Sequence, residues 1–461
     1  MTDRLRIAIV GGGFTGVAFI VHLARLLMRG PLDIDLIEPA AAPGAGIAYS
    51  ARDPLHRINV PSGRMSLFPG ESAHATDWFF QRQILPGDGA STDSSGDHYV
   101  ARAHYGAYVA DTLAKTLAAA PHVRLRHHRA RATHVARAGA GWSVALSNGQ
   151  SVAVDRVALC FGHAVAGPPC PVSDAAAGHP SLIANPWQPA GLAALDAQAR
   201  VLLVGTGLTM ADMGATLLDR GLRRITAVSR RGLMARPHGI FSSDANFLDG
   251  AAPPATALAL LRLARQRARA SNDRGLGWHP VADALRFSLS HLWPALPAAE
   301  RRKVVRRLLP FWDVHRFRVA PQVHQALTAA IGDGRLVIEK AGVTAIDADG
   351  NALVAHLRRP GGVLEAQRFE AIILCVGPDR DLTHNPLVRA LFEAGLARPD
   401  PIGLGLDVDA ESHLIARDGT IDRDLIALGP MTRGTFGEMT GAPDIARHIA
   451  RLAGLIAAGE A

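Results

Sequence analysis

The sequence predicts an α/β protein with two Rossmann-like dinucleotide-binding domains, small antiparallel meanders and a helical insertion. Three observations predict this fold. A glycine-rich turn between a short apolar strand and a helical pattern occurs twice. Each copy is followed by a meander and by a second apolar strand that ends on glycine. A block with helical periodicity, at about 255–330, interrupts the second copy.

The predicted domain boundaries follow from this duplication. Residues 1–165 form the first part of one dinucleotide-binding domain, and residues 196–365 form the other domain with its insertion. Residues 366–461 return to the first domain. A chain of 461 residues is long enough for two or three domains with sizeable cores.

The first unit begins with a buried-strand run, Ile7–Val10, and a helical pattern covers 17–28. Between them, Gly11, Gly13 and Gly16 have the GxGxxG spacing of a dinucleotide-binding turn. The first glycine permits the tight turn, the second lets the backbone approach a pyrophosphate, and the third lets helix and strand pack closely. This turn is a strong signal because strand and helix flank it.

Two further features complete the first site. The helix N-terminus, with Phe14 and Thr15, offers free N–H groups and partial positive charge to a pyrophosphate. A second strand, 34–37, ends at Glu38, which lies 22 residues after Gly16. A carboxylate at this position can accept hydrogen bonds from ribose hydroxyls.

The second unit repeats the plan with a different spacing. Strand 201–204 leads into Gly205 and Gly207, and the next small residue, Ala211, comes four positions later instead of three. Leu208 and Thr209 lie within this turn, ahead of a helical run that ends at Leu218. We assign the turn and the helix start to a second dinucleotide.

The end of the following strand distinguishes the two units. Where the first unit has Glu38, the second has Ser229, Arg230 and Arg231. Guanidinium groups can donate paired hydrogen bonds to a 2′-phosphate, whereas a carboxylate would repel it. The alternative interpretation is two solvated surface arginines.

Each unit also has a matching downstream half. Residues 123–159 and 335–374 alternate in short strand-like runs with turn signals, and each closes on an apolar strand. The glycines that follow these strands are Gly162 and Gly377, and a third such strand near the C-terminus ends at Gly429. We assign all three glycines to the cofactor sites.

Two stretches fall outside the repeat. Residues 43–105 are rich in Pro, Gly, Ser and His, and a connection of this length is typical of a functional loop. The insertion is predicted to contain helices over 255–270, 281–293, 297–312 and 321–331.

Composition narrows the function classes. The sequence contains no run of about 18 apolar residues, which argues against a membrane span. The net charge is +8 and nearly all cations are arginine, which fits a compositional preference or a surface that attracts anions such as nucleotide phosphates. Only 5% of residues are aromatic and the basic residues are spread out, which disfavours nucleic acid as a partner.

The three cysteines, Cys160, Cys170 and Cys375, form no CxxC pair, which disfavours a disulfide scaffold and a dithiol redox centre. The histidines show no metal-ligand spacing, so we expect no bound metal. Together these features predict a cytoplasmic protein.

The motifs as a set resemble a family of two-dinucleotide-domain flavoproteins, described as FAD/NAD(P)-binding, along nearly the whole chain. A more distant similarity runs to flavin-dependent N-hydroxylating monooxygenases. The resemblance implies FAD in the first unit and NADPH in the second. The motifs that carry it are Gly44-Ala-Gly-Ile-Ala-Tyr-Ser50, Asp53-Pro-Leu-His56, Asn59-Val-Pro61, Met65-Ser66, Gly205-Thr-Gly-Leu-Thr-Met210, Ser229-Arg-Arg-Gly232, Trp312-Asp-Val-His-Arg-Phe-Arg-Val-Ala-Pro321 and the run from Leu428 to Asp444.

The resemblance also implies contacts beyond the glycine turns. Asn59, Val60 and Met65 would lie against the flavin ring, the alternative being ordinary loop packing. His315, Arg316 and Arg318 are candidates to hold a carboxylate or phosphate group of a substrate, the alternative being a solvated helix face. No other catalytic residue is assigned.

Three functions share these motifs. The first is an FAD-dependent, NADPH-consuming monooxygenase that uses molecular oxygen on a small organic substrate. The second is a flavin-dependent dehydrogenase or reductase with an organic acceptor. The third is a nucleotide-binding regulatory protein without turnover, an option because Gly429-Pro430 replaces the Gly-Asp that holds the flavin ribityl chain in many relatives.

Overall fold

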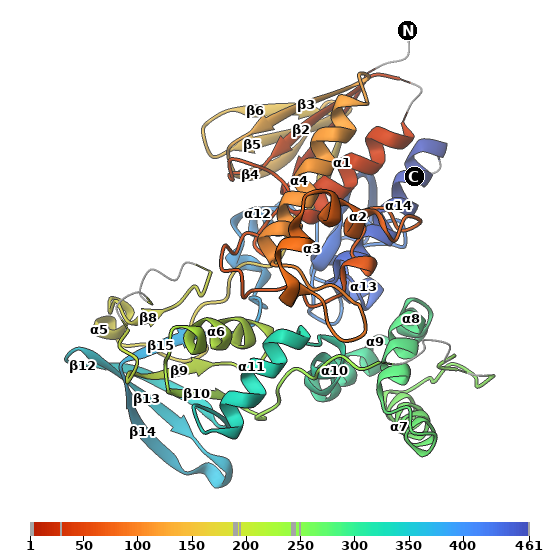
Figure 1. Ribbon diagram of the computed structural model, residues 1–461. Helices are drawn as coiled ribbons and strands as arrows, with labels where there is room; N and C mark the ends of the chain where they lie inside the picture. Colours follow the sequence, from red (N-terminus) through yellow and green to blue (C-terminus); the bar gives the residue numbers. More distant parts are fainter. Residues whose placement is uncertain are drawn as a thin grey trace.

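The computed structural model describes residues 4–27, 30–187, 192, 195–240, 246–248 and 250–459. Two sheet-centred bodies and a helical block make up the molecule (Figure 1). The N-terminal strand and the C-terminal helix lie in the same body, so the chain leaves this body for the second and then returns. The α/β fold with two Rossmann-like units is therefore confirmed.

The first body is built on a six-stranded sheet of order β16-β17-β7-β1-β2-β3. All neighbours are parallel except the edge pair β16 and β17. Its strands are β1 (Leu5–Val10), β2 (Leu32–Ile37), β3 (Val123–His128), β7 (Arg156–Leu159), β16 (His413–Ile415) and β17 (Ile421–Ala427).

The two faces of this sheet carry different layers because side chains alternate along a strand. Ile7 and Ile9 pack with helices α1 (Phe14–Leu26), α4 (Arg102–Ala118) and α14 (Ala442–Ala458). Ala8 and Val10 pack on the other face. That second layer contains the meander β4 (Ala132–Ala138), β5 (Gly141–Leu146) and β6 (Ser151–Val154), together with α12 (Pro386–Glu393).

The second body repeats this arrangement on a five-stranded parallel sheet of order β11-β10-β9-β15-β8. Helices α6 (Leu208–Asp219) and α11 (Pro321–Gly332) share one core with it, and a meander covers the other face. The strands are β8 (Leu182–Ile183), β9 (Arg200–Val204), β10 (Arg224–Ser229), β11 (Leu336–Lys340) and β15 (Ala371–Leu374), and the meander is β12 (Gly342–Asp349), β13 (Ala352–Arg358) and β14 (Leu364–Phe369).

One predicted boundary is wrong. β15 pairs with β9 in parallel register, Ile372 opposite Leu202, and so belongs to the second sheet. The chain returns to the first body only after this strand, not at residue 366. β8 also joins the second sheet, ahead of the predicted start at 196. Both strands are short and apolar, and periodicity does not say which sheet such a strand joins.

The helical insertion is shorter than predicted. It contains α7 (Ala257–Asp273), α8 (His279–Ala295), α9 (Ala298–Lys303) and α10 (Leu309–Arg316). The helix predicted over 321–331 is α11, which packs against α6 as the crossover helix between β10 and β11. The helix predicted over 297–312 is divided, because a π-helical turn at 304–308 precedes Pro310, which has no N–H to donate.

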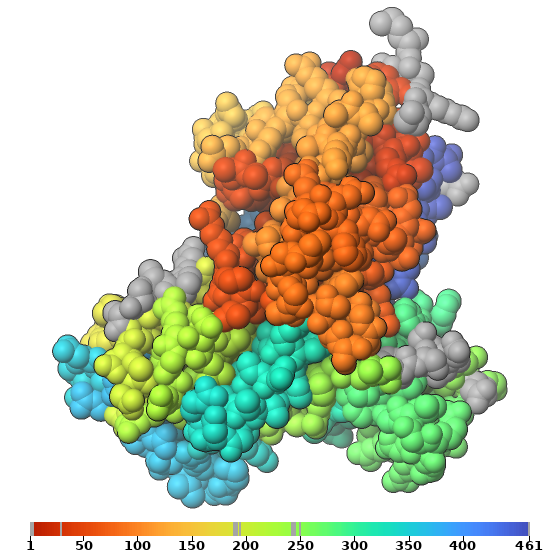
Figure 2. All heavy atoms as spheres, viewed as in Figure 1, coloured from red at the N-terminus to blue at the C-terminus, as the bar shows by residue number. Residues whose placement is uncertain are grey.

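The long segment 43–105 packs as short helices on the first body and reaches the second. It contains α2 (His74–Gln81) and α3 (Ile84–Gly87), with 3₁₀ turns at Ser62–Arg64 and Gly89–Ser91. Figure 2 shows this segment in orange, covering the upper body and meeting the green and teal surface below. Among the described residues no helix is long and apolar enough to cross a membrane.

Candidate functional site

The first glycine turn has the geometry of a pyrophosphate cradle. Gly11 has φ +105°, and a Cβ there would stand 3.0 Å from the carbonyl of Cys160 at the end of β7. A Cβ on Gly16 would lie 2.0 Å from the Gly11 carbonyl oxygen. Gly13 is the N-cap of α1, and no side chain caps the helix. The N–H groups of the first turn of α1 therefore remain available for an anion.

Glu38 is held at this turn by two backbone groups. The N–H groups of Gly12 and Ala40 each donate to one oxygen of its carboxylate, both at 2.8 Å. The side chain is half-buried. Each oxygen keeps a second lone pair, so the carboxylate can still accept hydrogen bonds from ribose hydroxyls.

The C-terminal segment returns to the same turn. Gly429 starts the 3₁₀ turn Gly429–Thr432, and a Cβ on it would stand 2.6 Å from Oγ1 of Thr15. Phe14 points away from this contact, because its ring stacks on Tyr105 in the core of the first body. Thus Thr15 and Gly429 are close together, and Phe14 can contribute only its backbone.

The second turn has the same first glycine and the same N-cap glycine as the first. Gly205 has φ +118°, and a Cβ there would lie 2.2 Å from the carbonyl oxygen of Cys375, at the end of β15. Gly207 is the N-cap of α6, again without a side-chain cap, and its surroundings are open. Leu208 and Thr209 begin α6 half-buried. Gly162 and Gly377, which follow the closing strands, are both exposed.

The arginines of the second unit stand at the carboxyl end of β10. Ser229 accepts a hydrogen bond from Thr206 Oγ1 at 2.8 Å, which ties the strand end to the glycine turn. Arg230 and Arg231 are exposed. The Arg231 guanidinium lies 4.9 Å from the ring centre of Phe311 in the insertion. Its Nη1 also donates a hydrogen bond to the Arg307 carbonyl oxygen at 3.4 Å. Both cations stand at the place where the first unit has Glu38.

The loop residues implied to touch a flavin have different environments. Met65 is 3% exposed and belongs to the core of the first body. Val60 is half-buried against the same core. The carbonyl oxygen of Asn59 accepts a hydrogen bond from Nε2 of His238, at 3.0 Å, so this loop is tied to the segment after β10. Burial lowers the pKa of His238 to about 4.

The predicted substrate clamp is corrected by the structure. Arg316 is buried, and its guanidinium donates to Glu438 and to Asp444, both at 3.0 Å. Arg318 is buried and donates to Asp283 at 2.6 Å. These arginines join the insertion to the C-terminal segment and to α8, so neither the clamp nor the solvated face describes them.

His315 is the one member of the predicted clamp that is neither buried nor ion-paired. It is half-buried, its Nδ1 lies 2.7 Å from the Phe311 carbonyl oxygen, and its ring packs edge-on against Trp278. A substrate contact by His315 stays a prediction.

A buried polar cluster at the junction of the two units was not predicted as a site. Nε2 of His56 lies 2.9 Å from Oγ1 of Thr216 in α6, and that hydroxyl donates to Asp53 at 2.5 Å. Arg102 forms an ion pair with Asp212 at 2.8 Å. Burial lowers the pKa of His56 and raises that of Asp212. The Asp53-Pro-Leu-His56 motif was the available signal, but its partner helix lies 160 residues further on.

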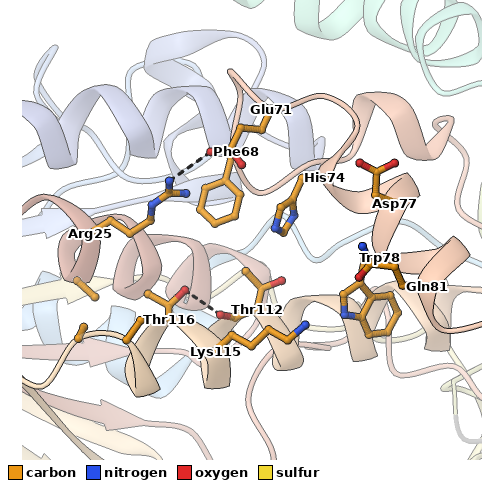
Figure 3. A pocket seen from close by; sticks show the side chains of 13 residues that line it. Arg25, Phe68, Glu71, His74, Asp77, Trp78, Gln81, Thr112, Lys115 and Thr116 are labelled. Carbon is orange, nitrogen blue, oxygen red and sulfur yellow. Dashed lines mark hydrogen bonds and ion pairs between the residues drawn. The ribbon is translucent and has the colours of Figure 1, made fainter.

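A hollow of about 580 Å³ lies between α1, α2 and α4, and Figure 3 shows the side chains that line it. Phe68, His74 and Trp78 form its aromatic side, and Arg25 pairs with Glu71 across its rim at 3.2 Å. The hollow lies beside the C-terminal end of α1, whereas the glycine turn is at the other end of that helix. It is therefore separate from the dinucleotide site.

Asp409, Glu411 and His413 form the one group among the described residues that could hold a metal ion, with ligand atoms within 4.8 Å of one another. His413 Nδ1 already donates to Asp409 at 2.8 Å, and the Asp409 carboxylate also accepts two backbone N–H groups. These bonds account for the arrangement, and the absence of a metal stays a prediction.

Two glycine turns on two Rossmann-like sheets define a fold with two candidate dinucleotide sites. Residues 8–164, which contain the whole first turn, match the family model described as FAD-NAD(P)-binding. No curated protein matches the chain.

Solved structures match the fold over full length at low identity. An ornithine N-hydroxylase from Kutzneria sp. 744 has a TM-score of 0.68 at 13% identity, with 100% of each chain covered. L-lysine 6-monooxygenase from Pseudomonas syringae has 0.65 at 16% identity, covering 99% of this chain and 98% of that one. A bacillithiol disulfide reductase from Staphylococcus aureus has 0.54 at 10% identity, covering 100% of each.

Proposed function

We propose that this protein is an FAD-dependent, NADPH-consuming oxidoreductase, specifically a monooxygenase that acts on a small organic substrate. FAD binds the first unit and NADPH the second. The observation that carries this proposal is the contrast between the two strand ends, with Glu38 at one glycine turn and Arg230 and Arg231 at the other. A carboxylate suits the free ribose of FAD, and guanidinium groups suit a 2′-phosphate.

The first turn fits FAD by its own geometry. A Cβ on Gly13 would stand 3.3 Å from Cα of Gly46, so a side chain there would crowd the segment that covers the uncapped N-terminus of α1. A pyrophosphate at this N-terminus would accept hydrogen bonds from the free N–H groups. Glu38 is oriented by Gly12 and Ala40 for the ribose hydroxyls. Thr15 and Gly429 close the other side of the turn.

FAD bound here would supply hydride acceptance and oxygen chemistry that no side chain can provide. The chain contributes positioning and exclusion of water. The junction bonds of His56 with Thr216 and of Asn59 with His238 hold the two units against each other. A fixed orientation of the two dinucleotide sites would serve hydride transfer between them.

A disulfide reductase with a dithiol centre is the alternative that shares this fold. Cys160 and Cys375 end the closing strands of two separate sheets, and burial raises the pKa of both thiols. A reactive cysteine needs an accessible thiolate, so these positions do not suit dithiol chemistry. The three cysteines are free, which supports a reducing compartment such as the cytosol.

The similarity to ornithine and lysine hydroxylases supports a small-molecule substrate and oxygen as co-substrate. An anionic group on that substrate now lacks its proposed partners, because Arg316 and Arg318 already donate to protein carboxylates.

The test is spectroscopic. Purified protein should carry a bound-flavin absorbance spectrum, NADPH should bleach it, and readmitted oxygen should restore it with consumption of oxygen. A colourless protein that cannot be reconstituted with FAD would contradict the proposal and favour the regulatory alternative. Bleaching without oxygen consumption, with or without candidate amines, would favour the reductase.

A further inference from the structure

Strand β10 has a pair of consecutive arginines at each of its ends. Arg230 and Arg231 follow its carboxyl end, at the proposed NADPH site, while Arg223 and Arg224 stand at its start. Five residues, 225–229, separate the two pairs, so that Arg224 and Arg230 are about 20 Å apart along the strand. The starting pair therefore lies at the edge of the sheet opposite the glycine turn.

A hollow of about 550 Å³ opens at this opposite edge. Val337, which is 44% exposed, gives it an apolar wall, Ile225 and Phe369 also line it but are buried, and four arginines surround it. Its volume falls within the range of small-molecule sites. The arginines are Arg200, Arg223, Arg224 and Arg368.

The charges around this hollow are not balanced. Arg200 pairs with Glu370 at 3.2 Å, and Arg368 pairs with Asp349 at 3.4 Å. Within the ranges that the structure describes, no hydrogen bond or ion pair reaches the guanidinium groups of Arg223 and Arg224, and both residues are exposed. Two positive charges are thus left over beside an apolar surface.

We propose that this hollow is a second anion site, which binds a small phosphate ester carrying a flat apolar group. A guanidinium fork matches phosphate oxygens in geometry and charge. The exposed side chain of Val337 would pack against the flat group, which distinguishes such an ester from inorganic phosphate. This site accounts for part of the arginine excess that the cofactor sites leave unexplained, and it does not depend on the proposed function.

Calorimetric titration of the FAD-loaded protein, with NADP⁺ present to occupy the nicotinamide site, tests this proposal. The probe is AMP, compared with adenosine and with inorganic phosphate. We expect AMP to bind at one additional site, at least tenfold more tightly than either control compound. No binding of AMP, or equal binding of inorganic phosphate, would overturn the proposal.

Two pairs of substitutions on the same strand provide matched variants. Arg223→Ala with Arg224→Ala should weaken AMP at least tenfold while FAD content and NADPH use stay unchanged. Arg230→Ala with Arg231→Ala, titrated at higher NADP⁺ concentration, should leave AMP binding within twofold. The reverse pattern would mean that AMP binds the nicotinamide site, and would overturn the proposal.

Val337 offers an independent variant, since its side chain is 44% exposed and its replacement need not disturb the core. Val337→Glu would place a carboxylate beside the proposed phosphate and should also weaken AMP at least tenfold. Unchanged AMP binding in this variant would contradict a small-ester site. Displacement of AMP from the unmodified protein by a polyglutamate peptide of higher affinity would contradict it as well.

Discussion

The two glycine turns share one backbone geometry and differ in the charge at the neighbouring strand end. Gly11 and Gly205 both have φ above +100°, and a Cβ on either would clash with a cysteine carbonyl at the end of a closing strand. Beside the first turn stands Glu38, and beside the second stand Arg230 and Arg231. Under the proposed function, the backbone of each turn would provide the pyrophosphate site, and the neighbouring strand end would select the nucleotide.

The two turns also differ in how closely they are packed. A Cβ on Gly13 would lie 3.3 Å from Gly46, whereas a Cβ on Gly207 would meet no atom within 4 Å. The segment from Gly44 onward closes over the first turn. A cofactor that stays bound needs such a cover, and a cofactor that exchanges every turnover needs an open site.

The largest effect is expected from matched substitutions in the two turns. Gly13→Val should give colourless protein, because the side chain would fill the pyrophosphate space and crowd Gly46. Gly207→Val should keep FAD, because a Cβ there would meet no protein atom within 4 Å, but its side chain should hinder NADPH and slow the reduction of the flavin. The absorbance of the purified proteins gives their FAD content, and its decay after mixing with NADPH gives the reduction rate. A full flavin spectrum in Gly13→Val, or its loss in Gly207→Val, would break the comparison.

The free energy of unfolding should respond differently to the loss of a buried arginine and of an exposed one. Arg316→Ala leaves Glu438 without its guanidinium partner and should lower the free energy of unfolding by about 3 kcal/mol, within the range for one partner of a buried pair. Arg230→Ala, at an exposed position, should change it by less than about 0.5 kcal/mol. Urea unfolding measures both variants. Unchanged stability with a raised substrate KM would restore the clamp hypothesis for Arg316.

Nucleotide preference is the next comparison. Each charge-assisted hydrogen bond to a 2′-phosphate contributes about 1.5–3 kcal/mol, and about 1.4 kcal/mol corresponds to tenfold. Arg230→Ala with Arg231→Ala should therefore remove most of a preference of tenfold or more for NADPH, with NADH use nearly constant. Flavin reduction rates with each nucleotide provide the measurement. If the double variant reduces the use of both nucleotides equally, the arginines do not read the phosphate.

A smaller effect concerns pH at the junction. The pKa of His238 is about 4 in the folded protein, below its usual value near 6.5. Between these values the unfolded chain binds the extra proton, so stability falls as the pH is lowered from about 6.5 to 4. His238→Gln keeps a donor for the Asn59 carbonyl and should flatten this slope. Melting temperatures of both proteins between about pH 6.5 and 4 provide the measurement. If stability falls as steeply with pH in the variant, the loss of stability comes from other histidines.

The duplicated plan could be predicted from sequence because strand, glycine turn and helix follow one another locally. The glycines, Glu38 and the arginine pair were all found in this way. The sheet to which β15 belongs could not be found, since a short apolar strand pairs equally well with either sheet. The carboxylates that face Arg316 lie more than 120 residues away, and no local pattern indicates them.

The contacts at the junction of the two units could not be predicted from the sequence either. Its bonds join residues of segment 43–105 to α6 and to the segment after β10, so each bond needs both units in place. Short polar motifs such as Asp53-Pro-Leu-His56 indicate that a constraint exists, but the partner becomes visible only in the folded chain.

In the proposed function, one unit holds FAD and the other delivers hydride from NADPH. Anaerobic stopped-flow mixing of the purified protein with NADPH, and separately with NADH, tests it most directly. We expect NADPH to bleach the bound flavin at least tenfold more efficiently than NADH. Equal efficiency with NADH, or flavin that neither nucleotide reduces, would contradict it.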